Sequence, residues 1–225
     1  MITVILLEPE NSGNVGAIAR VMKNFELAKL MLVNPKCDCK SSEAIARAMH
    51  GKDVLLKARV VKKVGKYDYL VGTTSKFGSD YNIPRSPISV SDLASKISKK
   101  DKVGLLIGRE GNGLTNAEID MCDFIVTIPA SKKYPVLNIS HACGIIFYEL
   151  FKDVEENSTS HFRPASKKDR EVLLDYFNSV LDTVEFATPD KKNTQRVVFK
   201  RVIGKALLTK REAFALIGLF KKLQK

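Results

Sequence analysis

The stretch Val103-Gly-Leu-Leu-Ile-Gly-Arg-Glu-Gly-Asn-Gly113 indicates the fold class of this 225-residue chain. Its first half, 103–107, is apolar throughout, as expected of a strand buried on both faces of a sheet. Its second half is a glycine-rich loop that leads to Thr115 and Glu118, which have the spacing of a helix capping box. A buried strand, a tight loop and a capped helix together form the repeating unit of an α/β fold.

Apolar strands alternate with amphipathic helices on both sides of this stretch. β-Branched and aliphatic runs predict the strands, and apolar residues at helical spacing predict the helices. We predict strands at 2–7, 30–33, 69–73, 103–107 and 124–128, and helices at 14–26, 42–49, 91–98 and 138–151. This alternation predicts an α/β fold with a parallel sheet that helices cover on both faces.

Polar or glycine-rich loops follow four of the predicted strands, at 8–16, 72–76, 108–113 and 129–138. The carboxyl ends of parallel strands meet at one edge of a sheet, and ligands bind there. We therefore expect a ligand site built from these four loops. The 108–113 loop alone is weak evidence, because it lacks the Lys-Ser/Thr pair of a phosphate-binding P-loop.

The positive charge of the chain is concentrated near its C-terminus. The net charge of +12 and the pI of about 9.5 suggest an anionic partner such as nucleic acid. Residues 158–225 hold 15 basic and 7 acidic side chains, a net of +8, whereas residues 1–157 hold 22 and 18, a net of +4. The junction at 155–160 is polar, as in a linker. We therefore predict an α/β domain at 1–157 and a basic extension at 158–225.

The extension carries signals for helices only. Ser166 with Asp169, and Thr209 with Glu212, have the spacing of capping boxes. Apolar residues at helical spacing fill the stretch between them. We predict three helices, from 166 to about 186, from 193 to 208 and from 209 to 223.

Composition excludes several classes of protein. A hydrophobic fraction of 44% is that of a globular chain and excludes wholesale disorder. The longest apolar runs are far shorter than the roughly 20 residues of a membrane-spanning helix, so we expect no membrane partner. Four cysteines without a secretory signal are expected to be reduced, which indicates a cytoplasmic protein. The three histidines lack the spacing of a metal site, so we expect no metal.

Three segments carry a specific combination of motifs. Segment 8–20 reads Glu-Pro-Glu-Asn-Ser-Gly-Asn-Val-Gly-Ala-Ile-Ala-Arg, segment 105–118 reads Leu-Leu-Ile-Gly-Arg-Glu-Gly-Asn-Gly-Leu-Thr-Asn-Ala-Glu, and segment 134–140 reads Tyr-Pro-Val-Leu-Asn-Ile-Ser. Their order and spacing resemble motifs one, two and three of the SPOUT methyltransferases, in their SpoU/TrmH branch. The resemblance covers residues 1 to about 155. With its helical extension, the chain is most similar to the TrmJ-type tRNA 2′-O-methyltransferases.

The resemblance implies a C-terminal trefoil knot near 103–148, S-adenosylmethionine as cofactor, and a homodimer. The residue types fit a cofactor site, since the aliphatic Ile128 and Leu137 could sandwich a purine and glycine permits close approach. For Ile128 and Leu137 the alternative is ordinary core packing. The cofactor contacts that the motifs imply fall on Thr73, Thr74, Ser75, Gly108, Ile128, Pro135, Val136 and Leu137.

The resemblance also assigns catalysis to Arg20, with Asn14, Glu110 and Asn138 beside it. A guanidinium normally stays charged, so we expect Arg20 to bind the target phosphate and stabilise the developing 2′-alkoxide. Deprotonation of Arg20 in a desolvated site is the alternative. We expect Asn14 to orient Arg20 or the ribose, and Asn138 to fix the knot loop or the ribose, although both could also cap helices. Glu110 could hold positive charge near the sulfonium, bond a backbone amide, or be a solvated loop acid.

Two departures from the family pattern affect the expected substrate range. Val136 stands where many relatives have Ser, so a hydroxyl contact is lost. Relatives often have arginines after the segment 73–75, but Lys76 stands alone here, and Lys does not replace a bidentate Arg contact to phosphate. Contacts to the RNA backbone are predicted at Lys76, Arg85, Lys191, Lys192, Arg196, Lys200, Arg201 and Lys205. The basic residues of the extension could instead form a solvated helix face.

The sequence therefore predicts an enzyme that methylates a ribose 2′-OH in tRNA, at the pyrimidine in position 32 of the anticodon loop. The rival substrates are ribosomal RNA or another tRNA position. The rival of another class is an RNA-binding or assembly factor that has lost turnover. The intact Asn14, Arg20, Glu110 and Asn138 argue against that loss, and Val136 is the feature in its favour.

Overall fold

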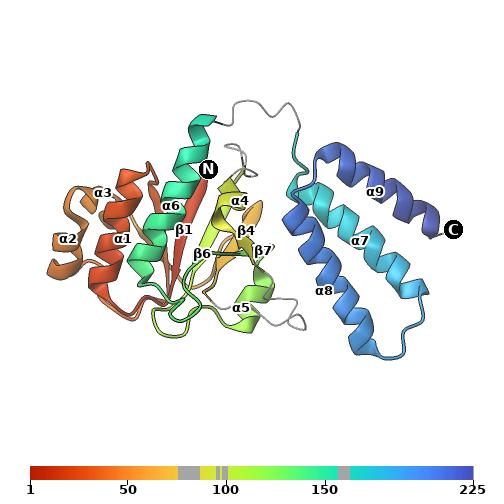
Figure 1. The fold of residues 1–225 in the computed structure, drawn as a ribbon, viewed down its shortest axis with the longest axis horizontal. Helices are drawn as coiled ribbons and strands as arrows, with labels where there is room; N and C mark the ends of the chain where they lie inside the picture. The colour runs from red at the N-terminus through yellow and green to blue at the C-terminus, as the bar shows by residue number, and fades with distance from the viewer. Residues whose placement is uncertain (76–86, 95–96, 98–100, 157–162, 225) are drawn as a thin grey trace. The chain divides into compact units, whose positions relative to one another are not determined.

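The computed structural model describes residues 1–75, 87–94, 97, 101–156 and 163–224, which form two compact units (Figure 1). The first, an α/β unit, holds the described residues up to 156. The second, a helical unit, holds those from 163 onward. The predicted RNA contacts of Lys76 and Arg85 lie outside the described residues.

Among the described residues, a seven-stranded parallel sheet forms the centre of the α/β unit. The strand order is β3 (Arg59–Val61), β2 (Lys29–Val33), β1 (Ile2–Leu7), β6 (Val103–Ile107), β4 (Tyr69–Thr73), β7 (Phe124–Thr127) and β5 (Ile88–Ser89). The predicted parallel sheet is confirmed, and β1, β4 and β6 span the residues expected. Since β6 pairs with β1 on one side and β4 on the other, the loops after these three strands are neighbours.

Helices cover both faces of the sheet, as predicted. On one face α6 packs between α1 and α4, and Figure 1 shows α1 and α6 side by side. On the other face α5 places Ile119 in a buried cluster with Ile5, Leu106 and Ile125 of the strands. The helical elements are α1 (Ser12–Asn24), α2 (Ser42–Ala48), the 3-10 turn η1 (Met49–Gly51), α3 (Lys52–Leu56), α4 (Val90–Ala94), α5 (Asn116–Met121) and α6 (Ile139–Glu156).

Some elements of the α/β unit differ from the prediction. α1 begins at Ser12 and not at Asn14, because the Asn11 side chain caps it by accepting a hydrogen bond from the backbone N–H of Asn14 at 2.9 Å. The edge strands β3 and β5 and the short helix α3 were not predicted. β3 has three residues and β5 has two, which is too short to show a period, and Val60 of β3 is 61% exposed.

The described part of the helical unit consists of α7 (Lys167–Thr183), α8 (Pro189–Ala206) and α9 (Lys210–Leu223). Capping boxes start α7 and α9 at Ser166 and Thr209, as predicted. The predicted start of the second helix at Asn193 is wrong. Thr188 caps α8, and Pro189 takes its first position, where no backbone N–H is needed.

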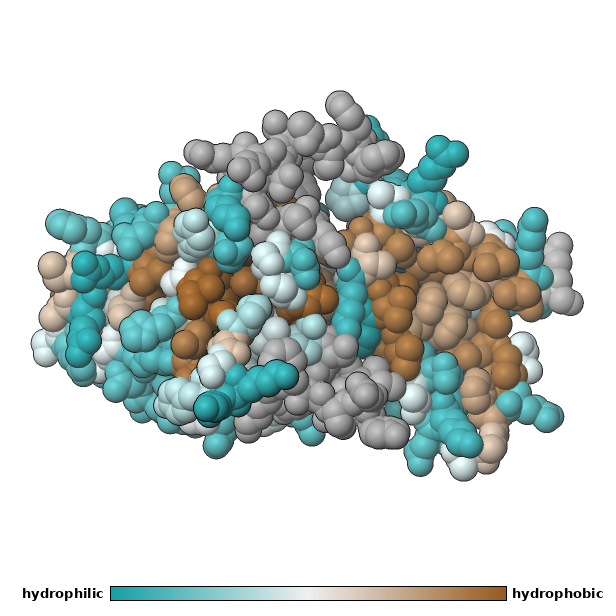
Figure 2. Space-filling model, in the orientation of Figure 1, coloured by the Kyte–Doolittle hydropathy of each residue, from teal (hydrophilic) through white to brown (hydrophobic). Residues whose placement is uncertain are grey.

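Three phenylalanines pack together inside the helical unit. The rings of Phe177 and Phe199 stack with centroids 3.8 Å apart, and Phe220 meets both edge-on at 5.4 and 5.5 Å. Apolar side chains also gather on the face of this unit seen in Figure 2. Val202 and Phe214 are each 53% exposed, so the unit leaves part of its apolar surface uncovered.

Candidate active site

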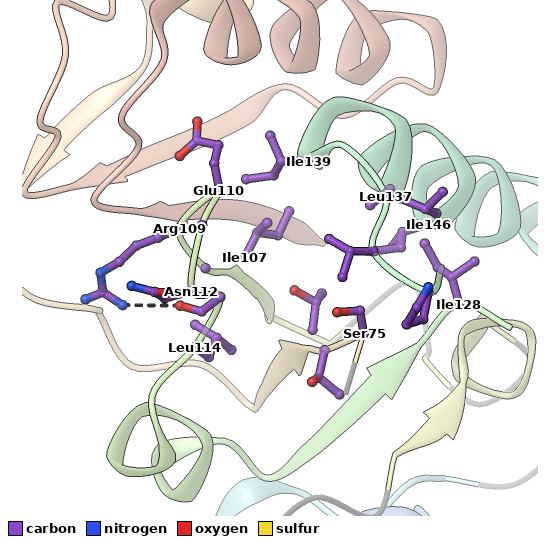
Figure 3. Close-up of a pocket in the computed structure, with 18 of the residues that line it drawn as sticks. Ser75, Ile107, Arg109, Glu110, Asn112, Leu114, Ile128, Leu137, Ile139 and Ile146 are labelled. Carbon is purple, nitrogen blue, oxygen red and sulfur yellow. Dashed lines mark hydrogen bonds between the residues drawn. The ribbon is translucent and has the colours of Figure 1, made fainter. Parts of the chain in front are cut away.

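A pocket opens at the carboxyl ends of β4, β6 and β7, three adjacent strands of the sheet (Figure 3). Its walls come from the ends of these strands, the 108–113 loop, the segment before α6 and the first turns of α6. Each of the residues predicted to bind the cofactor lines it: Thr73, Thr74, Ser75, Gly108, Ile128, Pro135, Val136 and Leu137. Their contact with a cofactor stays a prediction, but the structure brings them together from three distant parts of the chain.

The pocket has an aliphatic wall and a polar rim. Ile128, Leu137 and Ile146 lie together in Figure 3, and Ser75 lies across from them. The hydroxyl of Thr73 donates a hydrogen bond to the backbone oxygen of Leu106 at 3.3 Å. Apolar walls with a few convergent polar groups are typical of a site for a flat ligand that has polar substituents.

Glycines permit the sharp turn of the 108–113 loop. A Cβ atom on Gly108 would lie 2.3 Å from the backbone carbon of Gly113, so only glycine fits there. Gly113 has a φ of +66°, a left-handed conformation that disfavours other residues. The backbone N–H of Gly113 donates to the backbone oxygen of Arg109 at 3.1 Å, which closes the loop.

Arg109 joins the loop to two carboxylates. Its Nε donates to Glu8 at 3.0 Å, and its Nη atoms donate to both oxygens of Glu118 at 2.9 and 3.1 Å. The bonds to Glu118 and then to Glu8 raise the pKa of Arg109 above its usual range. Burial alone would raise the pKa of Glu118, but Arg109 and the Thr115 N–H together hold that pKa below its usual value. No role for Arg109 was predicted, because no local sequence signal identifies partners 101 residues upstream and 9 residues downstream.

Glu110, the neighbour of Arg109, binds different partners and connects the loop to the start of α1. Its carboxylate accepts hydrogen bonds from the backbone N–H groups of Glu10 at 3.1 Å and Asn11 at 3.3 Å. It also accepts from Asn14 Nδ2 at 3.4 Å, and Asn14 Oδ1 in turn accepts from Asn138 Nδ2 at 3.2 Å. The network joins residues from all three motifs. Of the roles left open for Glu110, the structure shows the bond to backbone amides.

Asn138 combines this contact with helix capping. Its side-chain oxygen accepts from the backbone N–H of Ser140 at 2.9 Å, and its backbone oxygen accepts from Ala142 at the start of α6. Asn14 does not cap α1, since Asn11 does. The structure therefore fixes both amide side chains beside Glu110.

Arg20 lies apart from these three residues. It is exposed on α1, does not line the pocket, and has no hydrogen bond or ion pair among the described residues. An α-helix advances about 1.5 Å and 100° per residue, so six residues separate Arg20 from Asn14 by about 9 Å and place it on another side of α1. Hydrogen bonds join Asn14 to Glu110 and Asn138, and Arg20 takes no part in that network.

The basic residues of α8 are not a uniform solvated face. Lys192 and Arg196 both pair with Asp182, at 2.8 and 2.9 Å. Arg201 is only 4% exposed, so it is not part of a solvated helix face, and its contact with RNA stays a prediction. Burial, and then the charge of Arg201, lowers the pKa of Lys205. Of the predicted RNA contacts in this helix, Lys191 is exposed, while Lys192, Arg196, Lys200 and Lys205 are partly buried.

The remaining titratable groups form no metal site among the described residues: no group of three or more His, Cys, Asp or Glu side chains could hold an ion. Cys37 and Cys39 are free thiols whose sulfur atoms lie 3.7 Å apart. Burial, followed by the contact with Cys37, raises the pKa of Cys39 to about 12. Within the described ranges, no helix is both long and apolar enough to cross a membrane.

Comparisons with known proteins agree with this geometry. The model of the SpoU rRNA Methylase family matches residues 1–148. The tRNA (cytidine-2′-O-)-methyltransferase TrmJ of Methanocaldococcus jannaschii is 40% identical over 228 residues, which cover 98% of this chain and 99% of that protein. A solved structure of a probable methylase family protein from Haemophilus influenzae has a TM-score of 0.71 and 27% identity, and the match covers 99% of this chain and 95% of that one.

A more distant solved structure shows the fold alone. The SpoU methyltransferase AviRb of Streptomyces viridochromogenes, in complex with the cofactor AdoMet, has a TM-score of 0.54 and 23% identity, over 70% of this chain and 61% of that one. The family match extends over most of the α/β unit, and the M. jannaschii enzyme is similar along its whole length. This chain therefore belongs to the SpoU rRNA Methylase family.

Proposed function

We propose that this chain is an S-adenosylmethionine-dependent tRNA 2′-O-ribose methyltransferase. The observation that carries the proposal is the 40% identity to a tRNA (cytidine-2′-O-)-methyltransferase over nearly the full length of both chains. We further propose that the target is the pyrimidine at position 32 of the anticodon loop, on the similarity of motif one and the helical extension to the TrmJ type. With tRNA as substrate, we place the enzyme in the cytoplasm.

The pocket has the chemistry that this cofactor requires. Ile128 and Leu137 offer apolar contact to the faces of an adenine, and the segment 73–75 offers hydroxyls and backbone groups to the polar atoms. Gly108 lines the pocket and permits the tight turn that brings the 108–113 loop to its edge. Bound S-adenosylmethionine would supply an electrophilic methyl group on a sulfonium.

The residues of this chain then have distinct tasks. Glu110 holds the backbone of Glu10 and Asn11, and so the start of α1, against the pocket loop. Asn14 and Asn138 present amide groups beside the pocket that can orient the ribose. Arg20, free of intramolecular partners in the described structure, binds the phosphate next to the target and stabilises the developing 2′-alkoxide.

We also propose the trefoil knot near 103–148 and the homodimer that the resemblance implies. The convergence of the 108–113 loop and the 135–137 segment on one pocket supports the knot. Exposed apolar side chains on α6, Ile145 at 39% and Tyr148 at 52%, support a second copy packing there. Light scattering should give about twice the chain mass of 25.0 kDa, and a monomer would contradict the dimer.

One experiment tests substrate class, position and activity together. Purified protein and cofactor are incubated with total RNA from a host that lacks the modification, and ribose methylation is mapped at nucleotide resolution. We expect a single new 2′-O-methyl group at position 32 of tRNA. Methylation of ribosomal RNA or of another tRNA position would replace the proposed substrate, and RNA binding without methylation would indicate the non-enzymatic alternative.

A further inference from the structure

Glu8 has an unusual backbone conformation at the point where the chain leaves β1. Its φ is +46°, in the left-handed region that residues with a Cβ rarely adopt. Such a conformation costs on the order of 1 kcal/mol and persists only where the surroundings hold it. In the segment 9–11 that follows, the backbone N–H groups of Glu10 and Asn11 donate to Glu110, and the Asn11 side chain caps α1. The direction of Glu8 therefore sets the position of the chain that carries Asn14 and Arg20.

Two groups hold Glu8: its backbone N–H donates to the backbone oxygen of Val33 at 2.7 Å, and Arg109 binds its side chain. The Arg109 Nε donates to Glu8 Oε2 at 3.0 Å, and both side chains are largely shielded, at 17% and 27% exposure. Arg109 lines the pocket with the rest of its loop, but in Figure 3 its side chain extends away from Ile128, Leu137 and Ile146. The remaining donors of the guanidinium bind Glu118 and the backbone oxygen of Gly113 at 3.3 Å.

The two carboxylates on Arg109 lead to different parts of the fold. Glu118 belongs to the capping box of α5, whose Ile119 packs in the buried cluster with the strands. Glu8 leads directly into the segment that ends in Asn14. Backbone hydrogen bonds of Glu8 with Val33 and of Pro9 with Lys36 fix the start of the segment 8–14. Arg109, through the Glu8 side chain, and Glu110, through Glu10, Asn11 and Asn14, add the side-chain contacts to it.

We propose that Arg109 is a positioning residue, which acts through Glu8 to align α1, with its Asn14 and Arg20, with the cofactor pocket. The bond of Arg109 to Glu118 only stabilises α5. The inference rests on the proposed methyl transfer, because the alignment matters only if α1 delivers groups to the reaction. A misplacement of about 1 Å can reduce an enzymatic rate by about 10²-fold. Loss of the Arg109–Glu8 bond is therefore expected to lower kcat far more than cofactor affinity.

The test compares the two carboxylates on one guanidinium. Glu8→Gln and Arg109→Lys are each expected to reduce kcat for tRNA methylation by about 10- to 100-fold, while the Kd for S-adenosylmethionine changes less than about threefold. Glu118→Gln is expected to lower the melting temperature and leave kcat within about twofold. The matched control is Asp53→Asn, which removes an exposed ion pair with Lys23 from the other end of α1.

The double variant Glu8→Gln/Arg109→Lys should be no slower than the slower single variant, because both changes weaken the same guanidinium–carboxylate bond. An equal loss of kcat in Glu118→Gln would overturn the proposal, since Arg109 would then act only on the fold of its loop. Unchanged kcat in Glu8→Gln would overturn it as well.

A second measurement is independent of turnover. Amide hydrogen exchange of residues 8–14, followed by mass spectrometry without substrate, should be faster in Glu8→Gln than in wild type and unchanged in Glu118→Gln and Asp53→Asn. If the wild-type protein transfers no methyl group, the proposed function fails, and this exchange still decides whether Arg109 holds the segment through Glu8. Equal exchange in all four proteins would overturn the positioning role.

Discussion

Arg20 is the residue on which the proposed chemistry depends most. It is exposed on α1, and the described residues offer it no ion pair, so its charge is available to an RNA phosphate. Removing one preorganised group that stabilises a developing oxyanion typically costs about 10²–10³-fold in rate. We expect Arg20→Ala to lose methyl transfer by this factor with cofactor affinity unchanged, measured by single-turnover kinetics and calorimetry. Lys23→Ala, on the same helix, is the control, and a parallel loss of cofactor affinity in Arg20→Ala would contradict the assignment.

A second prediction at the scale of the residue concerns the close packing around Gly108. A methyl group there would meet the backbone of Gly113 and Leu114 at 2.3 and 2.6 Å, and backbone cannot move aside as a flexible side chain can. Gly108→Ala is expected to destabilise the fold by about 1–3 kcal/mol and to weaken cofactor binding. Gly111→Ala serves as the stability control, because a Cβ there meets no atom within 4 Å. Equal denaturant midpoints for the two variants would contradict this account of the loop.

The two neighbours Arg109 and Glu110 show what residue-level sequence reasoning can find. Glu110 was identified because it stands in a recognisable motif, although its partners, the amides of Glu10 and Asn11, had to be seen in the fold. Arg109 stands in the same motif, yet its function is set by Glu8, which lies 101 residues away in sequence. A single sequence contains no signal for such a pairing.

At the scale of elements, the capping-box carboxylates of α7 and α9 are expected to make the stability of the chain depend on pH. The Thr209 backbone N–H lowers the pKa of Glu212, and the Ser166 side chain lowers that of Asp169. These folded-state pKa values lie below the unfolded ones, so the stabilisation is present above about pH 4 and is lost as the pH falls through the folded values. We expect the melting temperature of the full chain to fall below about pH 4, and to fall less in the double variant Asp169→Asn/Glu212→Gln. Identical acid profiles, followed by circular dichroism, would contradict this.

At the scale of elements, prediction succeeded where the signal is local. The capping boxes at Thr115, Ser166 and Thr209 were read from residue types three positions apart, and each starts a helix. The edge strand β3 could not be found in this way, since two of its three side chains are exposed and its pairing with β2 depends on the assembled sheet. The early start of α8 was missed because the Thr188-Pro189 signal precedes the apolar period by several residues.

At the scale of the whole molecule, the convergence of loops was predictable and their contacts were not. A parallel sheet places the carboxyl ends of its strands at one edge, so the loops after β1, β4, β6 and β7 had to be neighbours. Which side chains pair there depends on strand order, and the position of β6 between β1 and β4 brings Arg109 to Glu8. The trefoil knot was expected only from the family resemblance, because the periodicity of apolar residues does not show whether the chain passes through a loop.

The distribution of charge over the two units yields the last prediction. Residues 158–225 carry a net charge of +8, but Asp182 neutralises part of it by pairing with Lys192 and Arg196, and Arg201 is buried. If the remaining cations contact tRNA phosphates, their loss lowers affinity and flattens its salt dependence by about 0.7–0.9 in log–log slope per contact. We expect the truncated chain 1–157 to bind S-adenosylmethionine as the full chain does, yet to bind tRNA at least 10-fold more weakly. Filter binding across a salt series measures both quantities, and an unchanged affinity and slope would show that the α/β unit alone attracts the RNA.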